Sequence, residues 1–340
     1  MGAWYYILPV ERVSDLRIKT RLLKLLEDNK DAYVSGNDIA KELSVSRNSI
    51  WKAVKSLRAE GYEISALTNN GYRLESSGDV ISIAGITRHF KSDGVFIVDV
   101  MKSVTSTNTV MRDLAVKGMP EGCVLAAEGQ TAGKGRLGRG FHSPAGHGAY
   151  FSLLLRPGSR TKEAALITSA AAVASARAIE EVMGVESGIK WVNDLLVGGK
   201  KVCGILTEAV FDMESGMVES AVLGIGINTT RPKEGFPKSL EGIAAPLADR
   251  VEGKDGERCR LIATTLENFW GYYQNLENRG FLDEYRARSV ILGKDIYVLS
   301  GSVKTPARAI AIDDECGLVV RYENGETATI SSGEVSVRAM

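Results

Sequence analysis

Residues 128–141 read EGQTAGKGRLGRGF, and this stretch decides which class of fold the chain can adopt. Three of its glycines fit the G-x-G-x-x-G spacing of dinucleotide-binding folds, which require a helix to follow. Residues 142–155, HSPAGHGAYFSLLL, instead place proline and glycines before an apolar run that is typical of a strand. The acidic residue that binds ribose in such folds is also missing, since no Asp or Glu lies between Glu128 and Glu163. The sequence therefore excludes a dinucleotide-binding fold.

The glycine-rich loop has the composition of an anion-binding site. From residue 129 to 162 there are six Lys or Arg residues and no carboxylate, and Lys134, Arg136 and Arg139 lie among the glycines. Glycine lets backbone N–H groups approach an anion closely, and the cations neutralise its charge. The alternative, an ordinary surface loop, usually carries mixed charge. We expect a phosphate, a carboxylate or a nucleic acid to bind here.

Length and composition limit the remaining possibilities. The 340 residues allow two or three domains, and 42 basic against 42 acidic residues leave any anion affinity to local patches. Four cysteines without a C-x-x-C pair and three histidines without an H-E-x-x-H motif predict neither a disulfide framework nor a protein-held transition metal. The start, MGAWYYILPVER, matches neither a signal peptide nor a membrane span. We expect a cytoplasmic protein without a membrane partner.

The first quarter of the chain has the pattern of a winged helix-turn-helix. Helical spacing over 16–27 precedes a short helix near 39–43 and a third helix over 46–61, and a turn at Asn70-Gly71 then joins two short strands. A solvated helix in a small bundle is the alternative, and the hairpin favours DNA binding. The polar face of the third helix carries the side-chain types that contact phosphates and base edges, namely Arg47, Asn48, Ser49, Lys52 and Lys55.

The rest of the chain alternates strands with helices and then changes to strands alone. A polar linker over 75–80 precedes the mixed region, and five short strands separated by turns begin close to Gly293. The predicted fold class is therefore α+β multidomain, with a winged helix-turn-helix (1–78), a central mixed α/β catalytic domain (79–291) and a small C-terminal β-barrel (292–340).

Three further segments carry polar groups or bare backbone that a scaffold does not need. TSTN (105–108) precedes a helical stretch, and a simple helix cap explains it equally well. KWVND (190–194) places a lysine where a strand ends, next to a hairpin across Gly198-Gly199. GIGIN (224–228) removes side chains from one strand face, which admits a flat ligand.

In this order, these motifs closely resemble those of the biotin protein ligases. The resemblance rests on STN, GQTAGKGRLGR, KWVND followed by KVCGILTE, and GIGIN, and it spans about residues 16–338. The appended domains resemble the bifunctional ligase-repressor subclass, in which the small C-terminal barrel is SH3-like. The chain departs from the family pattern at Lys134, where arginine is common, and at Val192, where proline is usual. Lysine keeps the charge of arginine but loses its bidentate geometry.

The resemblance implies an enzyme with two half-reactions. Biotin and ATP would form biotinyl-5′-adenylate and pyrophosphate, and a lysine of a biotin carboxyl carrier protein would then take the biotinyl group. Mg²⁺ would be held mainly by the ATP phosphates. The adenylate would promote a homodimer that binds a palindromic operator DNA, so the chain would also be a biotin-responsive repressor.

The matching motif positions imply a role for each site residue. Lys190 and Arg136 would be catalytic, and Asp194 would be a weak magnesium ligand through the nucleotide. The residues implied for biotin are Ser106, Thr107, Asn108, Gln130, Lys134, Gly135, Arg136, Lys190 and Gly204. Those implied for ATP or the adenylate are Lys134, Arg136, Arg139, Asn193 and Asn228.

Three other functions remain open at this point. A lipoate ligase would share the adenylation chemistry and would need a longer pocket. A transcriptional regulator that only senses a small ligand would not need the phosphate-binding cations. A ligase whose helix-turn-helix no longer regulates transcription would keep the catalytic motifs unchanged.

Overall fold

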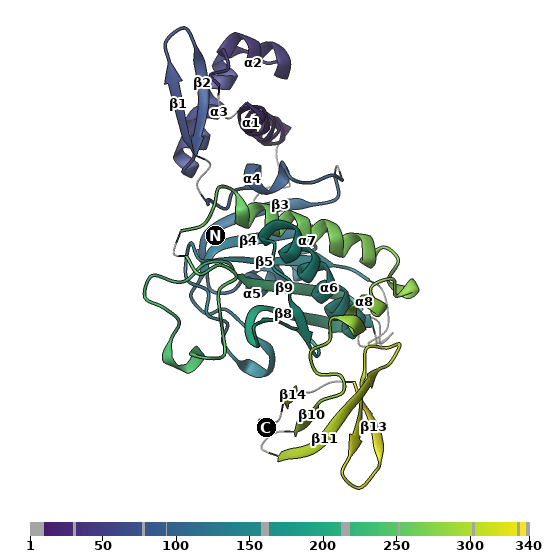
Figure 1. Ribbon diagram of the computed structural model, residues 1–340. Helices are drawn as coiled ribbons and strands as arrows, with labels where there is room; N and C mark the ends of the chain where they lie inside the picture. Colours follow the sequence, from purple (N-terminus) through teal and green to yellow (C-terminus); the bar gives the residue numbers. More distant parts are fainter. Residues whose placement is uncertain are drawn as a thin grey trace.

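A computed structural model gives the protein's structure and describes residues 10–29, 32–76, 79–92, 94–157, 163–211, 218–250, 252–300, 303–331 and 334–337. Three parts follow one another along the molecule, with the N-terminal helices at one end, a large sheet in the middle and a small sheet at the other end (Figure 1). The predicted α+β multidomain class is confirmed, whereas the predicted boundaries at 78 and 291 stay predictions.

The N-terminal part is the predicted winged helix-turn-helix. Ser35 and Ser46 cap the second and third helices through their hydroxyl oxygens, and Gly61 ends the third helix with φ of 108°. Leu22, Ile39 and Leu57 belong to a separate hydrophobic core that these elements share. The elements are α1 (Val10–Asp28), α2 (Gly36–Leu43), α3 (Arg47–Glu60), β1 (Glu63–Leu67) and β2 (Gly71–Ser76).

The central part is a seven-stranded sheet in the order β3-β4-β5-β9-β8-β7-β6, in which only β3 and β4 are parallel. The order explains why four segments far apart in sequence meet: β5, β9 and β8 are neighbours, and β4 lies beside β5. The strands are β3 (Ile97–Val104), β4 (Cys123–Gln130), β5 (Gly148–Leu155), β6 (Gly188–Lys190), β7 (Asp194–Val197), β8 (Lys200–Phe211) and β9 (Val218–Asn228).

Helices cover both faces of this sheet. Because side chains alternate along a strand, Leu153 and Leu155 of β5 pack in the core that includes α6 and α7, whereas Leu154 packs in the cluster with α5. The helices of this part are α4 (Ile83–Thr87), α5 (Thr107–Val116), α6 (Glu163–Met183), α7 (Glu257–Tyr273) and α8 (Leu282–Ala287), with 3₁₀ turns at Arg136–Gly138, Lys238–Leu240 and Leu276–Asn278. No helix of the described residues is long and apolar enough to cross a membrane.

The C-terminal part is a five-stranded antiparallel sheet in the order β13-β12-β11-β10-β14. The indole N–H of Trp191 donates to the Cys316 carbonyl at 2.9 Å and joins this sheet to the central part. The strands are β10 (Asp295–Ser300), β11 (Val303–Ile312), β12 (Leu318–Tyr322), β13 (Thr327–Ile330) and β14 (Glu334–Val337).

A buried arginine anchors the segment that connects the winged helix-turn-helix to the sheet. The Arg258 guanidinium, 3% exposed, contacts the carboxylates of Asp79 and Glu128, each at 2.8 Å. Burial raises the pKa of the Asp79 carboxyl, and the charge of Arg258 opposes that rise. Glu128 also accepts from the Ile81 N–H at 2.8 Å. The linker and the C-terminal end of β4 therefore share one ionic anchor.

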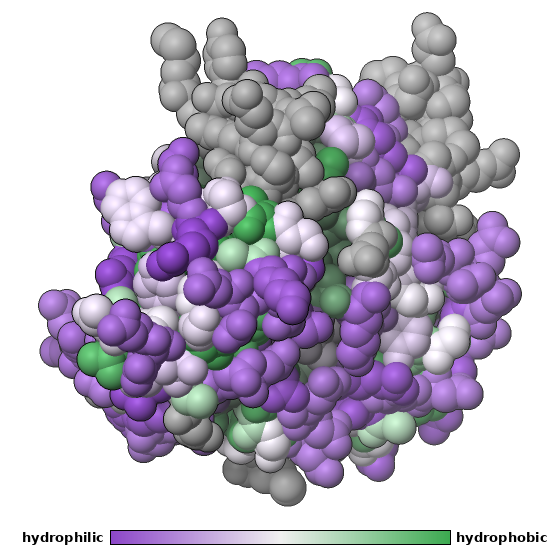
Figure 2. Space-filling model, turned by 90° about the horizontal axis from the view of Figure 1, so that it is seen from above, coloured by the Kyte–Doolittle hydropathy of each residue, from purple (hydrophilic) through white to green (hydrophobic). Residues whose placement is uncertain are grey.

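Direct contacts also join the winged helix-turn-helix to the α4 region. Glu27 of α1 forms an ion pair with Arg88 at 2.8 Å, and the hydroxyls of Tyr62 and Ser82 lie 2.7 Å apart in a buried environment. Seen from this end of the molecule, hydrophilic side chains cover most of the visible face (Figure 2). The winged helix-turn-helix is thus held against the α4 region by polar contacts and is not simply tethered to it.

Replacing Arg258 should destabilise the whole protein. Arg258→Ala leaves the buried Asp79 carboxylate without its partner, and removing one member of a buried ion pair costs about 3–5 kcal/mol. Denaturant unfolding of the full chain measures the change. Arg308→Ala, which removes an exposed pair with Asp295, should leave the unfolding midpoint almost unchanged. Equal midpoints for the two variants would contradict the anchoring role.

Candidate active site

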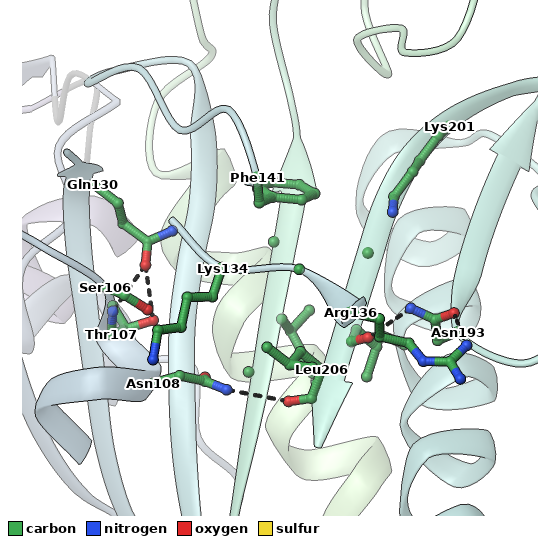
Figure 3. A pocket seen from close by; sticks show the side chains of 16 residues that line it. Ser106, Thr107, Asn108, Gln130, Lys134, Arg136, Phe141, Asn193, Lys201 and Leu206 are labelled. Carbon is green, nitrogen blue, oxygen red and sulfur yellow. Dashed lines mark hydrogen bonds between the residues drawn. The ribbon is translucent and has the colours of Figure 1, made fainter. Parts of the chain in front are cut away.

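A pocket lies on the face of the central sheet that α5 covers, where the glycine-rich loop folds over β8 and β9 (Figure 3). Its lining comes from the four motif segments that are distant in sequence. The lining residues are Ser106, Thr107, Asn108, Gln130, Lys134, Gly135, Arg136, Phe141, Asn193, Lys201, Gly204, Ile205, Leu206, Gly224, Ile225 and Gly226. The structure therefore brings the four motif segments together at one pocket.

Polar groups at the start of α5 form one end of the pocket. The side chain of Ser106 makes no capping hydrogen bond, so a helix cap does not account for the TSTN motif. The Gln130 amide oxygen instead accepts from the Thr107 N–H at 2.8 Å, and its nitrogen donates to the Ser143 hydroxyl at 2.8 Å. This arrangement ties α5 to the loop that follows β4.

Asn108 lies across the bare backbone of β9. A side chain at Gly224 would meet the Asn108 amide oxygen, because an added Cβ would lie 2.0 Å from it. That oxygen is 2.6 Å from the hydroxyl of Ser152, which is fully buried. The amide nitrogen donates to Glu208 at 2.9 Å and to the Leu206 carbonyl at 3.3 Å. The first glycine of GIGIN thus makes room for a protein side chain.

Aromatic and cationic side chains close the other end of the pocket. The Phe141 ring lies over Gly204 and Gly226, where added Cβ atoms would come within 3.0 and 2.5 Å of it. The Lys201 ammonium is 5.7 Å from the centre of this ring and 2.6 Å from the Asp194 carboxylate. The enclosed volume is about 40 Å³, which is enough for a little water but not for a bicyclic ligand.

The glycine-rich loop brings two further cations, Lys134 and Arg136, to the pocket. The Gly135 N–H donates to the Arg139 carbonyl at 2.7 Å, which closes a short loop, and Leu137 at its tip has φ of 56° and is 71% exposed. The Arg136 guanidinium donates to the Asn193 amide oxygen at 3.1 Å. Asn193 in turn donates to the Ile205 carbonyl at 2.8 Å. Arg136 is therefore aimed at the β7–β8 side of the pocket.

Four predicted site residues lie outside the pocket lining. Lys190 ends β6 and pairs with Asp194 across the β6–β7 hairpin. Asp194 contacts Lys201, Asn228 donates to the Ala245 carbonyl at 3.4 Å, and Arg139 is exposed. Lys190 is therefore not among the residues that line this pocket, which include the lysines Lys134 and Lys201.

If side chains alternated regularly along β8, Lys201 would point away from the pocket. A β-bulge in this strand explains why it lies in the pocket lining. Gly204, Leu206 and Glu208 share the α5 face of β8, so strict alternation would place Lys201 on the opposite face. The pairing of β7 with β8 shifts between Leu195 and Leu196, which adds one residue to β8 and returns Lys201 to the pocket side.

Burial raises the pKa of the neighbouring Cys203 thiol far above its usual value, which disfavours the reactive thiolate form.

The second candidate site is the exposed face of α3. Arg47, Asn48, Lys52 and Lys55 are exposed, and Ser49 is half-buried beside its cap Ser46. Trp51, to which sequence reasoning gave no role, is 52% exposed and lies under the Lys55 ammonium, 5.4 Å from the centre of its ring. An exposed indole among cations suits base and sugar contacts as well as phosphate binding.

Each of the three parts of the chain matches a known protein family. Residues 100–228 match the biotin/lipoate A/B protein ligase family, residues 19–73 match an HTH domain and residues 291–338 match the biotin protein ligase C-terminal domain. The biotin protein ligase of Aquifex aeolicus in complex with biotin and ATP superimposes with a TM-score of 0.60 at 26% identity, over 72% of this chain and 99% of that one.

Curated relatives extend the similarity to both end domains. The bifunctional ligase/repressor BirA of Bacillus subtilis is 34% identical over 317 residues, which cover 91% of this chain and 95% of that protein. The biotin–[acetyl-CoA-carboxylase] ligase of Mycobacterium tuberculosis is 32% identical over 253 residues, or 70% of this chain and 88% of that protein. The chain therefore belongs to the biotin protein ligase family, with the domain composition of its bifunctional ligase/repressors.

Proposed function

We propose that the chain activates biotin with ATP and transfers it to a lysine of a biotin carboxyl carrier protein. The observation that carries this proposal is the convergence of a cluster of neutral hydrogen-bonding groups and three cations, Lys134, Arg136 and Lys201, on one pocket. Neutral donors and acceptors suit the ureido ring of biotin, and the cations suit a carboxylate that approaches a phosphate.

In the first half-reaction, a biotin carboxylate oxygen bonds to the α-phosphorus of ATP, and the bond from that phosphorus to the bridging oxygen breaks. Pyrophosphate leaves with the electron pair. Two anions must approach each other, so Lys201 and Arg136 lower the barrier by holding the carboxylate and α-phosphate oxygens. We assign to Lys201 the role that the sequence motif suggested for Lys190, because Lys201 lines the pocket and Lys190 does not.

In the second half-reaction, the amine of the acceptor lysine attacks the acyl carbon, and AMP leaves with the electron pair as the amine loses a proton. No side chain of this chain becomes covalently modified. The glycine-rich loop covers the adenylate until the carrier arrives, which keeps water from hydrolysing the anhydride. The Phe141 ring lies close over Gly204 and Gly226, so we expect it to move when biotin enters.

We expect magnesium to bind together with ATP. Among the described residues, no group of three His, Cys, Asp or Glu side chains could hold a metal ion. The Asp194 carboxylate is already paired with Lys201, so it is poorly placed to supply a ligand of its own. A magnesium ion would therefore be bound mainly by the ATP phosphates, as is usual for this cation.

For the regulatory half, the adenylate would favour a homodimer whose two α3 helices reach successive major grooves of an operator. The exposed cations of α3 and the polar contacts that hold the winged helix-turn-helix to the sheet support this proposal. A fixed DNA-binding domain allows a dimer to present both helices at a defined spacing.

Substitution of the two lysines separates the two possible assignments. Lys201→Ala should lower the rate of biotinyl-adenylate formation by about 10²–10³-fold, the range for removing one stabilising donor from a reacting oxyanion. Lys190→Ala should leave the rate nearly unchanged. Pyrophosphate release in single turnovers measures both. A severe loss in the Lys190 variant alone would reverse the assignment.

Filling the space above β9 should damage biotin binding. Gly224→Ala forces Asn108 from its position because of the 2.0 Å contact, and we expect the KM for biotin to rise at least about tenfold, the usual worth of a lost hydrogen bond. Gly271→Ala in α7, where an added Cβ meets nothing within 4 Å, is the matched control. Steady-state kinetics with biotin varied decide the outcome, and an unchanged KM would contradict the placement of Asn108.

DNA binding should depend on the cations of α3 and on biotin. A duplex selected from a random-sequence pool in the presence of biotin and ATP should bind more weakly when biotin is omitted. Lys52→Ala should reduce the slope of log affinity against log salt by about one, as expected for one lost phosphate contact. Fluorescence anisotropy measures both effects. Equal binding with and without biotin would refute the regulatory half, and ligase activity would be unaffected.

A further inference from the structure

Glu208 stands at the end of a chain of hydrogen bonds that leads into the pocket. It lies on the same face of β8 as Gly204 and Leu206 but does not itself line the pocket. Its Oε2 atom accepts from the Asn108 Nδ2 atom at 2.9 Å, and Arg112 lies 3.6 Å from its Oε1 atom. The proposed ligase chemistry gives this carboxylate no role.

A carboxylate fixes the orientation of the amide that it contacts. An ionised carboxylate only accepts hydrogen bonds, so the Asn108 nitrogen must face Glu208. The Leu206 carbonyl, another acceptor, lies on the same side at 3.3 Å. The Asn108 Oδ1 atom is therefore turned the other way, toward Ser152 and the polar end of the pocket. Figure 3 shows the amide nitrogen of Asn108 pointing to Leu206.

The same direction continues through the buried hydroxyls. Ser152 Oγ is 2.6 Å from Asn108 Oδ1 and 2.7 Å from Thr107 Oγ1. A serine hydroxyl has one proton and an amide oxygen can only accept, so the Ser152 proton goes to Asn108. The Thr107 hydroxyl then donates its own single proton either to Ser152 Oγ or to the Gln130 amide oxygen at 3.2 Å. Its lone pairs, like the second lone pair of Asn108 Oδ1, are left to accept from a ligand.

We propose that Glu208 is a positioning residue that sets the direction of this chain, so that the end of the pocket offers oxygen acceptors to ligand N–H groups. The inference rests on the proposed function, in which biotin brings two ureido N–H groups. Without an acceptor at position 208, the Asn108 amide can rotate and present its NH₂ group to these donors. Glu208 thus acts on ligand selection through Asn108 and not on the phosphate chemistry.

Three variants of the full chain test this role by changing what position 208 offers to Asn108. Glu208→Gln keeps an acceptor without the charge, and its KM for biotin should stay close to that of the wild type. Glu208→Leu removes the acceptor and should raise that KM about tenfold, with the KM for ATP and kcat nearly unchanged. Glu219→Leu, an exposed glutamate on the adjacent strand β9, is the control and should change none of the three.

A double-mutant cycle distinguishes a positioning role from a general structural one. Because Glu208 acts through Asn108, adding Glu208→Leu to Asn108→Ala should have no further effect on the KM for biotin. Additive losses, equal losses in the Gln and Leu variants, a fall in kcat that matches the rise in KM, or an unchanged KM in Glu208→Leu would each overturn the proposal. Failure of the wild type to form any adenylate would instead refute the proposed function.

Discussion

The site depends on the absence of side chains where α5 and the glycine-rich loop cross the sheet. Gly204 of β8 pairs with Gly226 of β9, and Gly224 pairs with Ser152 of β5. Any larger residue at these glycines would collide with Asn108, Lys201 or Phe141. Bare backbone is costly inside a sheet, because glycine loses more entropy on folding than other residues. Here it leaves the room into which the side chains of Asn108, Lys201 and Phe141, and then a ligand, can fit.

Much of this arrangement could be predicted from the sequence because the relevant signals are local. The serine caps, the glycine stops and the turn at Asn70-Gly71 specify the winged helix-turn-helix. The composition of the glycine-rich loop is by itself enough to predict an anion site there. Family resemblance then identified nine of the lining residues, including Asn193 and Gly204.

The remaining features could not be predicted because they depend on long-range geometry. Lys201 reaches the pocket through a bulge whose existence is decided by pairing with β7. The Phe141 ring and Ser152 come from segments whose local pattern reads as loop and apolar strand, and only the sheet order places them beside Gly224 and Gly226. Lys190 lies at the end of strand β6, as predicted, but is not among the residues that line this pocket. Knowing that a residue ends a strand gives its position along the sheet. It does not give the distance of that residue from segments elsewhere in the chain.

The ionic anchor at Arg258 has a practical consequence for anyone who wishes to separate the two activities. Asp79 and Ile81 precede the sheet, yet both are bound to it, through Arg258 and Glu128 respectively. A stand-alone ligase made by deleting the DNA-binding region should therefore start before Asp79. Removing Asp79 as well would leave the buried Arg258 without one of its two carboxylate partners. Removing Ile81 would also take away the N–H group from which Glu128 of β4 accepts.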